Sequence, residues 1–195
     1  RSPGGGDNLF LSSIVAVNAS TGKMLWYYQT TPGDNWDYTA VQDMMLADME
    51  VDGKMRKVIM QAPKNGFFYV LDRQTGELLR ANPYVTVNWA THIDMETGRP
   101  VENPDKNFLT GESKWILPGP LGGHNWQSMS YNPNTGLVYI PALENPLVFD
   151  VEHDFKATGR FKYIEGGWNT GVEFGRIMEL IGEHPDLPKG KGYIT

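Results

Sequence analysis

The feature that most constrains the fold is a short pattern that recurs along the chain: an apolar strand, a polar turn ending in Thr-Gly, and a second strand. It occurs at 14–26, 67–79 and 129–140, and a looser copy with a longer turn runs over 148–161. In the first three copies an Asn or Asp stands three residues before the Thr. Asx side chains bond their own turn backbone and Gly accepts positive φ, so each copy predicts a β-hairpin.

Hairpins that recur about every 40 to 60 residues fit the four-stranded blades of a β-propeller. The six Trp and nine Tyr suit strands, and the 22 Gly and 13 Pro suit the turns between them. We therefore expect an all-β fold, a partial propeller of roughly three to four blades of antiparallel four-stranded sheets. Further strands are expected at 41–49, 56–61 and 84–93, and 170–182 is expected to be either a short helix or a long excursion between strands.

The chain has 195 residues, begins at Arg1 without a methionine and ends at 193–195 in what reads as the start of a strand. We expect residues 1–195 to form a single partial-propeller domain that is truncated at both ends. Three or four blades cannot close a ring, and an open ring exposes strand edges, which soluble proteins avoid.

Charge and composition exclude several classes of function. The formal net charge is −6 and no basic stripe is present, which argues against a nucleic-acid partner. The apolar runs are far shorter than the roughly 20 residues that span a bilayer, so no membrane segment is expected in this stretch. No signal peptide is visible at the amino end. With no Cys, the stretch contains no disulfide and no Cys-based haem attachment.

Three loops carry more chemistry than a turn needs. We name them the first site loop (31–39), the second site loop (61–66) and the third site loop (119–127). Each joins strands, so all three are expected to gather near one end of the propeller axis. A carboxylate, an ammonium and an amide beside an indole would meet there, making a polar site with an aromatic wall.

Four segments of the chain, three of which overlap the site loops, resemble PQQ-dependent (quinoprotein) alcohol dehydrogenases. They are 2–16, 31–39, 62–68 and 124–126, and they follow the order of that family at compatible spacing. The resemblance is clearest over 1–145 and thins after Pro146. It implies an internal part of an eight-bladed propeller enzyme.

By this resemblance Asp37 matches the catalytic base, which takes the proton of the alcohol hydroxyl while a hydride passes to pyrroloquinoline quinone (PQQ). In several members of the family this Asp also touches the metal ion, which acts as a Lewis acid on the quinone. The alternative interpretation is that Asp37 caps its own turn, as many turn aspartates do.

The resemblance assigns three residues to the cofactor. Lys64 matches the ammonium that hydrogen-bonds the quinone oxygens, and a Lys here resembles the ethanol-type rather than the methanol-type enzymes. Asn125 and Trp126 match an amide and an indole in contact with the quinone. The alternatives are a solvated turn lysine, an ordinary turn asparagine and a tryptophan packed in a blade core.

The metal implied by the resemblance is Ca²⁺, because Thr39 offers no carboxylate of the kind that lanthanide-using relatives carry two residues after the base. Asp37 is its only ligand in this chain; the family's other metal ligands precede Arg1. Asp34 is expected to serve a turn. The four histidines are scattered without metal-ligand spacing, and His124 is interpreted as structural or surface.

The leading hypothesis is a periplasmic enzyme that oxidises primary alcohols to aldehydes and passes electrons to an acceptor such as a cytochrome c. One alternative is a non-catalytic propeller that serves as a binding scaffold. Another is a related quinoprotein that acts on sugars or aldehydes. The sequence leaves open the substrate range, the oligomeric state, the presence of a haem domain and the role of 146–195.

Overall fold

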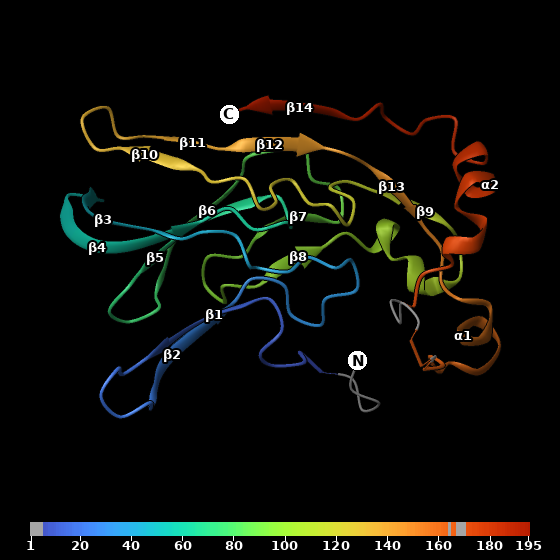
Figure 1. Ribbon diagram of the computed structural model, residues 1–195, viewed down its shortest axis with the longest axis horizontal. Coiled ribbons are helices and arrows are strands. Elements are labelled where there is room, and N and C mark those ends of the chain that lie inside the picture. Colours follow the sequence, from blue (N-terminus) through green and yellow to red (C-terminus); the bar gives the residue numbers. More distant parts are fainter. Residues whose placement is uncertain (1–5, 164, 167–170) are drawn as a thin grey trace.

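The computed structural model describes residues 6–163, 165–166 and 171–195, and this part of the chain is built mainly of antiparallel β-strands (Figure 1). The expected all-β class is confirmed. Residues 2–5 of the first resembling segment, and Thr170 at the start of the expected helix, lie outside the described residues. Within the described ranges, no helix is long and apolar enough to cross a bilayer.

The first hairpin pairs β1 (Ser13–Val17) with β2 (Met24–Gln29). The next sheet is a four-stranded antiparallel meander, the form expected of a propeller blade. Its strands are β3 (Met45–Val51), β4 (Lys54–Gln61), β5 (Phe67–Asp72) and β6 (Leu78–Pro83). The strand expected at 56–61 is confirmed within β4.

The other sheets of the described residues have two strands each. The pairs are β7 (Ala90–Ile93) with β8 (Pro100–Glu102), β9 (Lys114–Ile116) with β13 (Leu147–Phe149), β10 (Ser130–Asn132) with β11 (Leu137–Tyr139), and β12 (Pro141–Glu144) with β14 (Lys191–Ile194). The strand expected at the end of the chain is β14. The strand expected at 41–49 is observed as β3, which begins only at Met45. Of the strand expected at 84–93, only the last four residues form a strand, β7.

The turns of the first three hairpins share one construction. The Oδ1 atoms of Asn18, Asp72 and Asn132 accept the backbone N–H two residues later at 3.0, 2.9 and 2.9 Å. The glycine that closes each turn has φ between 68° and 80°. A fourth turn of this kind, from Asp94 to Gly98, joins β7 to β8. Sequence reasoning missed it, although its spacing is the same.

The prediction of a looser hairpin over 148–161 is wrong for its second strand. After β13 the chain forms the helix α1 (His153–Thr158), and Gly159 ends it with φ 68° and an N–H bond to Phe155 O of 2.8 Å. Thr-Gly therefore serves a helix end here, where a left-handed glycine is also favoured. The residues of α1 before the Thr include no β-branched side chain, which permits the helix.

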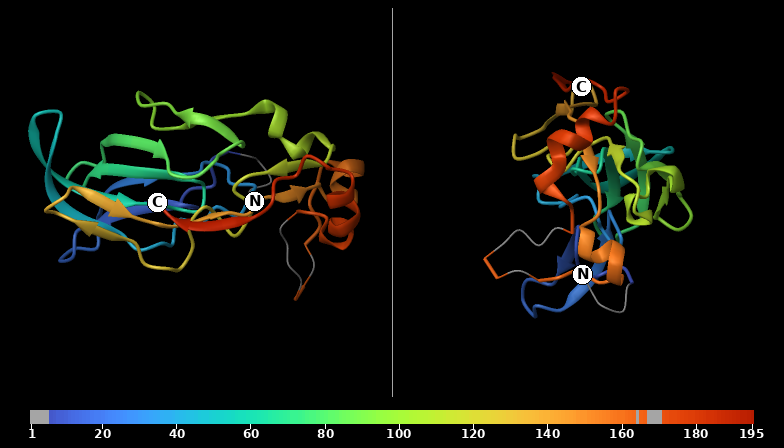
Figure 2. Two further views of the ribbon diagram at one scale, coloured as in Figure 1. Left: turned by 90° about the horizontal axis from the view of Figure 1, so that it is seen from above. Right: turned by 90° about the vertical axis from the view of Figure 1, so that its right-hand side faces the viewer.

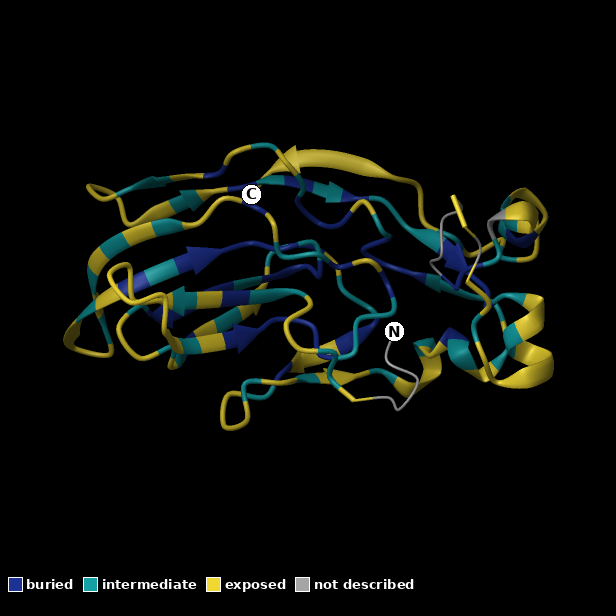
Figure 3. Cartoon of the chain, turned by 60° about the horizontal axis from the view of Figure 1, so that its bottom comes forward, coloured by how far each residue is buried: buried dark blue, intermediate teal, exposed yellow. Residues whose placement is uncertain are grey.

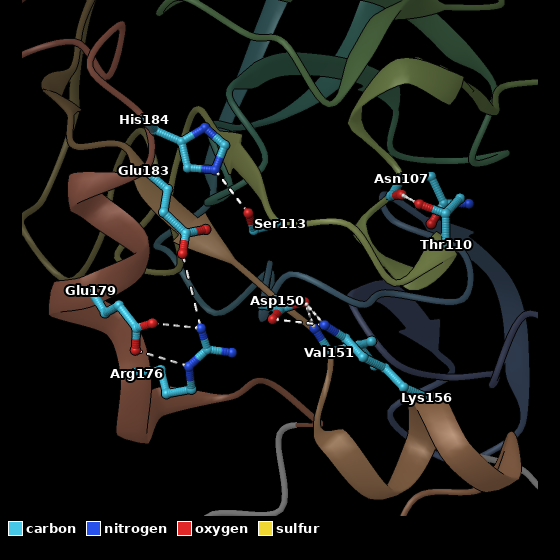
Figure 4. Close-up of polar contacts among 10 residues, drawn as sticks. All are labelled: Asn107, Thr110, Ser113, Asp150, Val151, Lys156, Arg176, Glu179, Glu183 and His184. Atoms are coloured by element: carbon cyan, nitrogen blue, oxygen red, sulfur yellow. Dashed lines mark hydrogen bonds and ion pairs between the residues drawn. The ribbon is translucent and has the colours of Figure 1, made fainter.

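Between β13 and β14 lies a long connection, which we call the excursion, and the structure describes its residues 150–163, 165–166 and 171–190. It contains the 3₁₀ turn η3 (Phe174–Arg176) and α2 (Ile177–Gly182), so the short helix expected within 170–182 is confirmed. Figure 4 shows Arg176 donating to Glu179 at 3.0 and 2.8 Å on this excursion. Two further 3₁₀ turns, η1 (Pro104–Lys106) and η2 (Phe108–Thr110), precede β9.

Two contacts fix the end of this excursion to β9 and the residue before it. Ser113 Oγ lies 3.0 Å from His184 Nε2 (Figure 4), and Trp115 Nε1 donates to Asp186 Oδ2 at 2.7 Å. Seen from above, the molecule is elongated, with α1 and α2 at one end and the β3–β4 hairpin at the other (Figure 2).

The main apolar core lies in the middle of the molecule, where the strand segments are buried (Figure 3). Trp89 is its centre: its ring lies 4.8 Å from Trp36, 5.3 Å from Tyr38 and 6.1 Å from Phe67, measured between ring centroids. These aromatic contacts join segments that are far apart in sequence.

Neighbouring sheets also meet through aromatic side chains of β2. The indole of Trp26 packs on Gly76, where an added Cβ would lie 2.9 Å from the ring, and its N–H donates to Arg73 O at 3.2 Å. Trp26 therefore packs between two neighbouring sheets. The contact also explains why the Asp72 turn needs glycine, since a side chain would overlap the indole.

Candidate functional site

The first site loop is anchored in the core on both sides of Asp37. Trp36 is 3% exposed and Tyr38 is 0% exposed, while the Asp37 side chain is 60% exposed. Because both neighbouring rings turn inward against Trp89, the carboxylate between them is directed outward. Asp37 has φ 66°, a left-handed conformation that is uncommon for a residue other than glycine and that often marks functional positions.

The turn in this loop is capped by Asp34, as expected, and not by Asp37. Asp34 Oδ1 accepts the Trp36 N–H at 2.9 Å. The Tyr38 hydroxyl donates to Pro118 O in the segment that leads into the third site loop. Burial raises the pKa of Tyr38 well above its usual value, so this hydroxyl stays protonated as a donor.

The second site loop brings Lys64 to Asp37. Lys64 Nζ lies 3.1 Å from Asp37 Oδ2, and the Lys64 side chain is only 12% exposed. Asn65 fixes the approach, because its Nδ2 donates to Thr30 O at 3.1 Å and to the Tyr69 hydroxyl oxygen at 2.8 Å. The expectation that the carboxylate and the ammonium meet at one end of the sheets is confirmed.

The third site loop lies directly on Lys64. A Cβ added to Gly122 would come within 2.4 Å of Lys64 Cγ, and the Gly123 N–H donates to Lys64 O at 2.9 Å. Gly122 has φ 83°, which lets the backbone pass over the lysine stem. The gathering of all three loops, expected from their positions between strands, is therefore confirmed.

Asn125 and Trp126 lie on the outer part of the third site loop. Asn125 Nδ2 donates to Leu121 O at 2.7 Å, which braces the loop. Trp126 is 83% exposed, so its interpretation as blade-core packing is wrong. A large aromatic face that is open beside buried neighbours is suited to stacking against a planar ligand.

The contacts that support the loops from beneath were found by the structure and not by sequence reasoning. His124 is fully buried, as a structural histidine would be. The Gln42 side chain donates to His124 O at 3.2 Å, and the Gln61 side chain donates to Gln42 O at 2.8 Å. These are contacts between a side chain and a distant backbone carbonyl, and they leave no pattern in the sequence.

The side chains of the three site loops suit a planar, polar ligand better than they suit a metal ion alone. Lys64 supplies an ammonium, Asn125 an amide and Trp126 an open ring. Among the described residues, no group of three or more His, Cys, Asp or Glu side chains could hold a metal. Asp37 offers one carboxylate, whereas Ca²⁺ takes six to eight oxygen ligands, so Asp37 alone is not a calcium site.

Comparison with known proteins gives consistent matches. The family model described as "Glucose/ethanol/alcohol dehydrogenase, beta-propeller domain", named PQQ, matches residues 2–100. A quinohemoprotein alcohol dehydrogenase, ADH IIB of Pseudomonas putida, is 55% identical over 167 residues, which are 85% of this chain and 24% of that protein.

Two solved structures are similar in fold as well as in sequence. The quinohemoprotein alcohol dehydrogenase of Comamonas testosteroni matches with a TM-score of 0.81 and 46% identity over 100% of this chain and 28% of that one. A europium-containing methanol dehydrogenase matches with a TM-score of 0.75 and 40% identity over 83% of this chain and 27% of that one. The chain spans about a quarter of the length of the curated relatives that it matches.

Proposed function

The chain belongs to the family of PQQ-dependent glucose, ethanol and alcohol dehydrogenases with a β-propeller domain, and on that premise we propose that the protein oxidises primary alcohols to aldehydes. Residues 1–195 contribute one partial-propeller domain to this activity. The observation that carries the proposal is the ion pair of 3.1 Å between Asp37 and Lys64 at the meeting point of the three site loops.

Asp37 serves as the base. Its exposed carboxylate would take the hydroxyl proton of the alcohol while the carbon-bound hydrogen leaves as hydride, so that the alcohol carbon becomes the aldehyde carbonyl. PQQ, when bound, supplies the acceptor for the hydride. Lys64 has three N–H donors, so it can hold Asp37 with one and bond a quinone oxygen with another. Asn125 would offer an amide to the polar edge of the ring system, with the Trp126 indole beside it.

Ca²⁺ is part of the same proposal, with Asp37 as one ligand. Thr39 supports Ca²⁺ over a lanthanide, because it adds no second carboxylate to the loop for a trivalent ion. An electron acceptor such as a cytochrome c and a periplasmic location also belong to the proposal. The acceptor is supported by the name of a relative, 1-butanol dehydrogenase (cytochrome c), which is 50% identical over 175 residues, and the location is supported by the family resemblance alone.

The test uses the intact protein loaded with PQQ and Ca²⁺ and an artificial electron acceptor. We expect Asp37→Asn to lower ethanol turnover by at least about 100-fold, because a general base contributes on that order, while PQQ absorbance is retained. Asp34→Asn is the matched control in the same loop and should keep most of the turnover. Unchanged turnover in Asp37→Asn refutes the base, and an intact protein that takes up no PQQ favours a binding scaffold.

A further inference from the structure

His124 occupies an unusual place in the third site loop. It directly precedes Asn125 and Trp126, yet it is 0% exposed while Trp126 is 83% exposed. The loop therefore turns His124 into the protein and leaves Trp126 outward, with Asn125 half-buried between them. A buried imidazole needs polar partners, and the identity of those partners shows what it holds together.

The ring of His124 lies between two backbone carbonyls. Its Nδ1 is 2.8 Å from Ala62 O in the second site loop, two residues before Lys64. Its Nε2 contacts Gln127 O, within its own loop. The Nδ1 contact therefore joins two loops, whereas the Nε2 contact lies within a single loop, and a neutral ring donates through only one of the two nitrogens.

The link to Ala62 adds a second fixed point between these loops. The first is the bond of 2.9 Å from the Gly123 N–H to Lys64 O. One hydrogen bond lets a loop pivot about it, whereas a second contact at Ala62 O, two residues before Lys64, restrains its orientation. The orientation of Asn125 and Trp126 relative to the Lys64 ammonium therefore depends on the Nδ1 contact.

We propose that His124 is a positioning residue. Through its Nδ1 contact with Ala62 O it fixes the position of Asn125 and Trp126 relative to Lys64, so that the three side chains can contact one planar quinone. The inference rests on the proposed function, since it takes these three residues to be the cofactor contacts. His124 itself does not touch the cofactor.

The two conservative amides at position 124 separate the two ring contacts. The Asn side-chain nitrogen falls near the place of Nδ1, and the Gln nitrogen falls near the place of Nε2. His124→Asn thus keeps the link between loops, and His124→Gln keeps only the brace within the third loop. Both replace the imidazole by an amide, so they are a matched pair.

The experiment titrates PQQ into the intact apoprotein at fixed Ca²⁺ and follows its absorbance, with thermal unfolding measured for each variant. We expect His124→Gln to raise the PQQ dissociation constant by about 10-fold or more, the range of one well-formed hydrogen bond, and His124→Asn to stay within about 3-fold. His184→Gln, a histidine that pairs with Ser113 away from the site, should leave the constant unchanged.

Equal dissociation constants for the Asn and Gln variants overturn the inference. This holds if both constants match that of the wild type, and also if both rise equally while both variants lose stability. A Gln variant that does not fold overturns it as well, because the link would then support the fold and not the cofactor. A wild-type protein that takes up no PQQ refutes the proposed function itself, and that result is distinct from two variants that bind alike.

Discussion

At the scale of the residue, Asp37 and Lys64 meet because residues far from both in the sequence orient the loops that carry them. Their types and spacing within the two loops are visible in the chain. The left-handed φ of Asp37 and the inward turn of Trp36 and Tyr38 are not, because they depend on Trp89, which lies more than fifty positions further on. Local patterns thus indicate candidate chemistry, while long-range packing orients it.

Gly122 gives a test of the close approach between two loops. We expect Gly122→Ala to destabilise the protein by about 1–3 kcal/mol more than Gly136→Ala, because its Cβ would overlap the stem of Lys64. Gly136 is the matched control, since it also has positive φ but has nothing within 4 Å of the added Cβ. Urea unfolding of both variants measures the difference, and equal losses would show that the backbone conformation alone matters.

The lowered pKa of the Glu144 carboxyl group leads us to expect that the free energy of unfolding falls in acid. Burial acts to raise its pKa, but hydrogen bonds from Lys191, Thr86 and Tyr193 outweigh burial and lower the pKa from 4.5 to about 2. A lowered pKa in the folded state stabilises the protein above pH 4.5, and this contribution disappears as the pH falls toward 2. It amounts to about 3 kcal/mol.

The measurement is the free energy of unfolding as a function of pH. Glu144→Gln should be less stable than the wild type at neutral pH, and the difference should shrink between pH 4.5 and 2. Glu50→Gln, at an exposed position of β3, should leave the profile unchanged. A difference that persists undiminished at pH 2 would contradict the role given to the Glu144 carboxylate.

At the scale of the element, turn chemistry was the reliable signal. The Asn18, Asp72 and Asn132 turns were predicted because each is a local hydrogen-bonding unit. The Asp94 turn was missed, although it obeys the same spacing and its flanking strands, of four and three residues, are no shorter than those of the Asn132 turn. The helix α1 was predicted as a hairpin, since a glycine after a Thr ends a helix as readily as it closes a turn.

The docking of α2 gives a test at this scale. Leu180 is 2% exposed and α2 packs against β13, so Leu180→Ala should cost about 2–4 kcal/mol of local stability. Met178→Ala is the control on the same helix, because Met178 is 77% exposed. Hydrogen–deuterium exchange should increase over 171–187 only in the Leu180 variant. Equal exchange in both would mean that α2 is held by its ion pairs alone.

At the scale of the whole molecule, the sequence predicted a propeller-like all-β fold but not which side chains would be left uncovered. The outer face of the β1–β2 hairpin exposes Val15, Val17 and Tyr27, and Phe10 packs edge-on against Tyr27 at 5.2 Å. Such a contiguous apolar surface is costly in water and promotes association.

This surface predicts the behaviour of the 195 residues expressed alone. We expect them to self-associate, and we expect Val15→Thr with Val17→Thr to reduce the association, because Thr keeps the strand propensity and adds a hydroxyl. Sedimentation velocity over a range of concentrations measures both. A well-behaved monomer of the unaltered chain would contradict the prediction.

The repeated turns and the site loops occupy opposite ends of the same strands: β5, for example, runs from the second site loop to the Asp72 turn (Figure 1). The turn end is therefore a suitable place to attach a label without disturbing the site loops. A fluorophore or an affinity tag attached near Gly53, where an added Cβ meets nothing within 4 Å, would report on or immobilise the protein a full strand length away from Lys64.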